Sequence, residues 1–124
     1  MKPVATAAFV VIAAAACTTV AFLAVMKPSS VAGFLFFSAW LVAPHAVMAA
    51  ALWLRGRKGP APAYWHWIAI LVCILGVLYL ADPIFWHIDP QSAIAVVMAP
   101  FLQFIALAIL LPVAALVARL VRSG

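Results

Sequence analysis

Long runs of apolar residues alternate with short polar breaks along the whole chain. None of the runs contains Asp, Glu, Lys or Arg, and each has about the 17–25 residues with which a helix crosses a bilayer. Transmembrane strands would instead be about 10 residues long and would alternate in polarity. The sequence therefore predicts an all-α fold, a polytopic membrane protein with a four-transmembrane-helix bundle. The predicted helices cover residues 4–26, 31–54, 64–81 and 93–118.

Composition supports the same class of protein. The chain has 124 residues, of which 71% are hydrophobic and 7% are charged. A soluble domain of this size would have too few polar residues to cover so much apolar surface. We expect one transmembrane domain over residues 1–124, with Cys17 and Cys73 as small packing residues inside helices.

The basic residues predict an orientation. Six of the seven fall on one side of the predicted membrane and only Lys27 falls on the other. Basic residues of short loops stay in the cytoplasm, so both termini are expected inside and the location is a bacterial inner membrane. The net charge of +5 then predicts contact with anionic inner-leaflet lipid and not with nucleic acid. The six residues are Lys2, Arg55, Arg57, Lys58, Arg119 and Arg122.

Four polar side chains inside the predicted helices are candidates for a function within the membrane: His45, Gln103, Ser38 and Thr19. An ionisable residue at this depth is costly and suggests a role. His45 could hydrogen-bond a neighbouring helix, or it could bind a ligand. A soft metal could use His45 with Met48, but one His and one Met do not complete a site. We therefore predict a polar seam between helices and neither a metal nor a cofactor.

The segment of residues 82–92 is the second candidate region. It carries Asp82, His87, Asp89 and Gln91 on the outer face of the predicted membrane. One interpretation is a pair of Asp-Pro turns in which Asp89 caps the last helix. The other is a patch that recognises a ligand, an ion or a partner. Three ligands in so short a loop are a weak signal for a metal, so no metal site is predicted.

Two families are similar to parts of this pattern. Size and helix count resemble the small multidrug resistance transporters, but that family couples transport to a carboxylate in its first helix, and here residues 4–26 have none. The segment Asp89-Pro90-Gln91-Ser92-Ala93, followed by Pro100 and Gln103, resembles uncharacterised small bacterial four-helix inner-membrane proteins. That resemblance implies no particular activity.

Known catalytic motifs are missing from the chain, which has no nucleophile elbow, Gly-rich phosphate loop, HExxH or CxxC. We predict that it is not an enzyme. The favoured function is an accessory, assembly or interaction subunit whose partner is a membrane protein or a second copy. Small side chains on the first and last helices suit such association. The alternative is a small carrier or channel that uses the polar seam around His45 and Gln103.

Overall fold

The computed structural model describes residues 3–26, 30–59, 61–86 and 92–123. It confirms four helices that are long and apolar enough to cross a membrane. Within the described residues no strand occurs. The elements are α1 (Pro3–Val25), α2 (Val31–Arg57), α3 (Ala63–Ala81), the π-helical segment η1 (Asp82–Trp86) and α4 (Ser92–Ser123).

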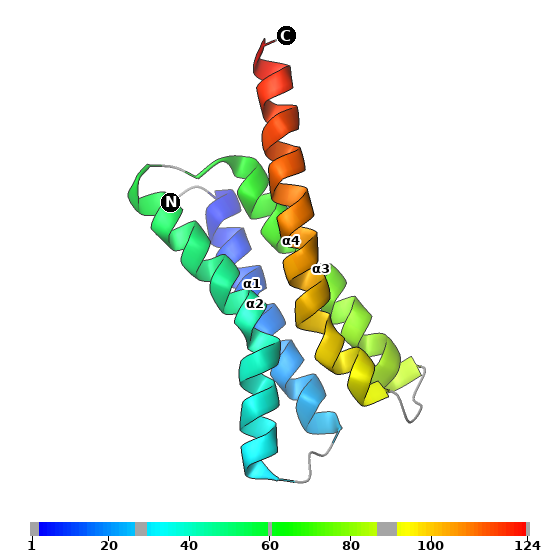
Figure 1. Cartoon of the computed structure of the whole chain (residues 1–124). Helices are drawn as coiled ribbons and strands as arrows, with labels where there is room; N and C mark the ends of the chain where they lie inside the picture. The colour runs from blue at the N-terminus through cyan, green and yellow to red at the C-terminus, as the bar shows by residue number, and fades with distance from the viewer. Residues whose placement is uncertain (1–2, 27–29, 60, 87–91, 124) are drawn as a thin grey trace.

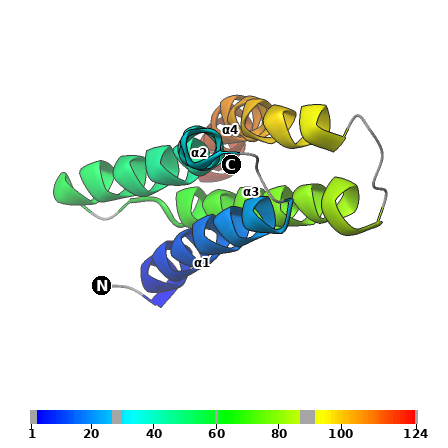
Figure 2. The ribbon, with the colours of Figure 1, turned by 90° about the horizontal axis from the view of Figure 1, so that it is seen from below.

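The helices form a bundle of two layers. α1 lies beside α3 in one layer, and α2 lies beside α4 in the other (Figure 2). α1 also packs against α2, and α3 against α4. The start of α1, the connection from α2 to α3 and the end of α4 lie at one end of the bundle (Figure 1). We call this the terminal end, and the opposite end, where α1 ends and η1 lies, the far end.

Two helices extend further than predicted. α2 continues to Arg57 and α4 to Ser123, past the predicted ends at residues 54 and 118. The prediction ended each helix just before its first basic residue, where an apolar span must end. A helix does not have to end there, because cations near its C-terminus interact favourably with the helix dipole. α2 ends when Lys58 donates its backbone N–H to the Arg55 carbonyl (3.2 Å), and Gly59 follows at φ 129°.

The predicted turn at Asp82 is wrong. Asp82 is helical (φ −60°, ψ −59°), and η1 extends α3 through Trp86. Pro83 has no N–H to give to the carbonyl of Tyr79 four residues earlier, and the wider π register accommodates this missing bond. Tyr79 ties this region to α4, because its hydroxyl donates to the Ala95 carbonyl at 2.9 Å. The second predicted turn, at Asp89, lies outside the described residues.

Buried apolar residues form two separate clusters, one toward each end. The terminal-end cluster joins α1, α2 and α3 and consists of Ala8, Ile12, Ala15, Met48, Leu52, Ile68, Ala69, Val72 and Cys73. The far-end cluster joins all four helices and η1, and consists of Leu23, Leu41, Leu80, Ile84, Val96 and Ala99. The fold therefore has an apolar core in two parts, with a short interval between them.

Candidate functional site

Three of the four predicted intramembrane polar residues lie in the interval between the clusters. Thr19, His45 and Gln103 are exposed by only 1%, 2% and 6%. Thr19 and His45 each lie between residues of the two clusters along their helices, and Gln103 follows the far-end cluster on α4. Gly76 lies between the two clusters on α3. We call Thr19, His45, Gly76 and Gln103 the polar layer. The flanking cluster residues are Ala15 and Leu23 on α1, Leu41 and Met48 on α2, Cys73 and Leu80 on α3, and Ala99 on α4.

Hydrogen bonding in the polar layer is incomplete. Thr19 satisfies its hydroxyl within α1 by donating to the Ala15 carbonyl at 2.8 Å. Among the described residues, neither ring nitrogen of His45 has a hydrogen-bond partner, and neither does Nε2 of Gln103. The His45 ring lies near the backbone of Leu41, one turn earlier, without forming a well-aligned hydrogen bond with it. The layer thus holds buried polar groups that the chain itself leaves unpaired, and such groups cost free energy.

Gly76 makes room for Gln103, and sequence reasoning missed this role. A Cβ atom at Gly76 would lie 3.0 Å from Cδ of Gln103 and closer still to Nε2. The Gln103 amide therefore lies directly on the backbone of α3. The available signal was a single glycine within the apolar run of α3, which often marks close approach of another group.

Trp40 joins α2 to α4 beside the far-end cluster and was also missed. Its indole Nε1–H donates to the Val97 carbonyl at 2.9 Å, and its ring meets that of Phe101 edge-on at 5.1 Å between centroids. Pro44 and Pro100, both buried within these helices, lie close by along the chain. Trp40 is half-buried, and an indole away from water usually finds an acceptor, so a tryptophan inside an apolar run was the signal available in the sequence.

The remaining predicted site residues are not brought into the layer. Ser38 is half-buried with an unpaired Oγ, but it precedes His45 by two turns, or about 10 Å along the helix. Asp82 is exposed at the end of α3, while His87, Asp89 and Gln91 lie outside the described residues. In the described part of the chain, no group of three or more His, Cys, Asp or Glu residues could hold a metal.

Five small residues and one valine form a regular exposed line along α1. Its members are spaced alternately three and four residues apart, which is the spacing of a coiled-coil seam. The only large apolar side chains that α1 exposes in its described residues are Val10 and Val25. Exposed alanines also occur on α2, where large side chains such as Phe36 and Trp53 interrupt them. The line, called the α1 seam below, consists of Ala7, Val10, Ala14, Cys17, Ala21 and Ala24.

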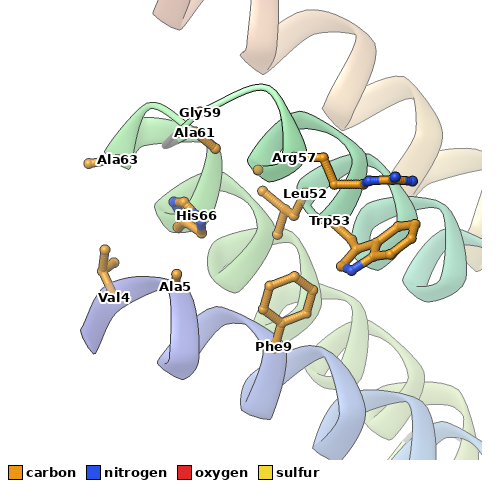
Figure 3. Close-up of a pocket in the computed structure, with 11 residues that line it drawn as sticks. Val4, Ala5, Phe9, Leu52, Trp53, Arg57, Gly59, Ala61, Ala63 and His66 are labelled. Carbon is orange, nitrogen blue, oxygen red and sulfur yellow. The ribbon is translucent and has the colours of Figure 1, made fainter. Parts of the chain in front are cut away.

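A cavity of about 670 Å³ opens at the terminal end between α1, α2 and α3 (Figure 3). Apolar side chains such as Phe9 and Leu52 line it, together with Arg57 and the buried His66. A smaller cavity of about 280 Å³ between α2, α3 and α4 is lined mostly by apolar residues. Neither His45 nor Gln103 lines either of these cavities.

Comparison with known proteins adds no relative: no family model, curated protein or solved structure matches the chain. The class of the protein therefore rests on its own residues. It is a helical protein with four apolar helices of membrane-spanning length. Its candidate functional features are the polar layer, the α1 seam and the cavity at the terminal end.

Proposed function

We propose that the protein is a multi-pass protein of the bacterial inner membrane that acts as an accessory, assembly or interaction subunit, without catalytic activity. The α1 seam is the observation that supports this most directly. We infer that it docks against a transmembrane helix of the protein that this subunit serves.

The size and spacing of the seam residues favour docking of a helix. Lipid chains are as apolar as leucine, so the hydrophobic effect does not bring helices together in a bilayer. Helices associate there by close packing, which small residues allow because the two backbones can approach. The alternating spacing of three and four residues keeps the same face toward a partner along α1, whose length is about 34 Å. A lipid chain gains nothing from this regularity, whereas a second helix does.

Cys17 allows a direct test because it lies in the seam and is exposed, whereas Cys73 is buried. A thiol-reactive photo-crosslinker on Cys17 should give one discrete adduct in membranes. The double change Ala14→Leu with Ala21→Leu should reduce its yield roughly tenfold, because overpacking an interface costs about 1–3 kcal/mol.

Ala46→Leu, on the exposed face of α2, is the control and should leave the adduct unchanged. Mass spectrometry of the adduct identifies the occupant, and an adduct of twice the chain mass would make that occupant a second copy. An adduct that persists in the seam variant, or that Ala46→Leu removes equally, would contradict docking through the seam.

The terminal end of the bundle is expected to face the cytoplasm. A membrane-impermeant thiol reagent applied to intact cells should label a cysteine at Ser92 and should miss one at Lys58, both placed in a Cys17→Ala, Cys73→Ala background. The basic residues Arg55, Arg57 and Lys58 support this arrangement, because they gather at the terminal end. Lys58 is the better position than Gly59, whose φ of 129° would strain a cysteine. Labelling at Lys58 in intact cells would reverse the proposed orientation.

One observation favours the alternative, a small carrier or channel. The unpaired groups of His45 and Gln103 could hydrogen-bond a polar solute as it crosses the bundle. Against this, neither cavity described above is lined by these residues. The accessory role is therefore better supported than the carrier or channel. The substitution His45→Leu separates these two functions.

A further inference from the structure

The cavity at the terminal end combines an apolar body with polar groups at two places. Phe9, Leu52 and Trp53 supply much of its wall, and its volume of about 670 Å³ is that of an ordinary ligand site. His66 on α3 and Arg57 at the end of α2 lie apart in the lining, and the Arg57 side chain extends over Trp53 and away from His66 (Figure 3). A ligand that uses both groups must therefore extend across the cavity.

His66 supplies a buried polar atom that the chain does not pair. It belongs to the first turns of α3, and its side chain is only 6% exposed. Its Nδ1 atom has no hydrogen-bond partner among the residues that the structure describes. A buried nitrogen without a partner is unfavourable. Because His66 lines the cavity, a turn of its ring would bring this nitrogen to a ligand oxygen and relieve that cost.

Arg57 gives the cavity its charge. Its guanidinium lies over the Trp53 ring, 5.1 Å from the ring centroid, which holds the cation beside the apolar wall. Arg55 and Lys58 are its neighbours in the chain, whereas Asp82, the one acid among the described residues, lies at the far end. Among the described residues, the charged side chains at this end of α2 are therefore all basic, and they favour an anion.

We propose that this cavity is a binding site for an anionic phospholipid. Arg57 binds the phosphate at the rim, His66 hydrogen-bonds an oxygen of the glycerol backbone, and the apolar wall contacts the start of an acyl chain. A guanidinium suits phosphate because it is planar and carries several donors. The site is independent of the α1 seam, because none of the seam residues lines the cavity. Loss of partner docking and loss of lipid binding are thus separate outcomes.

Native mass spectrometry of the delipidated full-length protein tests the site, with phosphatidylglycerol added in detergent and phosphatidylcholine as the uncharged comparison. One phosphatidylglycerol should be retained per chain in preference to phosphatidylcholine. Arg57→Gln should weaken its retention roughly tenfold, since a charge-assisted contact is lost. His66→Phe should weaken it by a smaller factor, about threefold.

Arg122→Gln is the matched control, because it removes a charge at the same end of the molecule without touching the cavity. Ala5→Leu keeps every charge and places a larger side chain in the cavity, so it should also weaken lipid retention. If Arg57→Gln does not fold, this variant tests the site in its place. Equal weakening by Arg122→Gln would overturn the site in favour of diffuse attraction. Displacement of the lipid by inorganic phosphate at equal concentration would overturn the role of the apolar wall, and unchanged retention in Ala5→Leu would do the same.

Discussion

Gly76→Val is expected to destabilise the bundle by about 2–3 kcal/mol, because the added side chain overlaps the Gln103 amide. Gln103 is buried against α3, so its amide cannot move aside into open space. The higher helix propensity of valine offsets only a few tenths of a kcal/mol. Reversible unfolding in mixed detergent micelles, followed by circular dichroism, measures the change.

Gly56→Val is the matched control, because a Cβ at Gly56 meets no atom of the described residues within 4 Å. It should change stability little. The double variant Gly76→Val with Gln103→Ala should recover most of the loss, since the overlapping group is gone. Similar losses at Gly56 and Gly76, or no recovery in the double variant, would show that α3 and α4 do not meet at Gly76.

His45→Leu is expected to increase the free energy of unfolding by about 1–2 kcal/mol, since it replaces an unpaired buried imidazole with an apolar side chain. His45→Gln should give no such gain, because it keeps a polar group at the same place. The same unfolding measurement compares the two variants with the original chain.

A loss of stability of about 2 kcal/mol or more in His45→Leu would mean that the ring makes a hydrogen bond that the structure does not contain. The same variant also separates the two functions. Flux of a polar solute through liposomes that contain only this chain, abolished by His45→Leu, would favour a carrier or channel over the accessory subunit.

The helices could be predicted because their signal is local. A run of apolar residues is visible in the sequence whatever it packs against. The ends of α2 and α4 were harder to predict than the helices themselves, because Arg57 and Arg122 are compatible both with a continuing helix and with its end. The prediction at Asp82 was wrong because turn chemistry at an Asp-Pro pair does not reveal that the preceding helix can widen its register.

Pairing between helices could not be predicted in the same way. The polar character of His45 and Gln103 was clear from sequence, but the contact of Gln103 with Gly76 depends on which helices are neighbours. α1 presents a related difficulty. Its buried and exposed faces are both rich in alanine, so no contrast in polarity separates Ala15 from Ala14. Only the packed structure shows which of the two faces is used inside the bundle.

The division of the core into two clusters has a consequence for how the sequence can diverge. Residues that share no contacts usually contribute additively to stability, whereas residues in contact must change together. A substitution at Val72 in the terminal-end cluster therefore places little constraint on Leu80 in the far-end cluster, although both belong to α3. Compensating substitutions can therefore accumulate separately in each cluster. Substitutions in one cluster depend on those in the other mainly through the residues that lie between them.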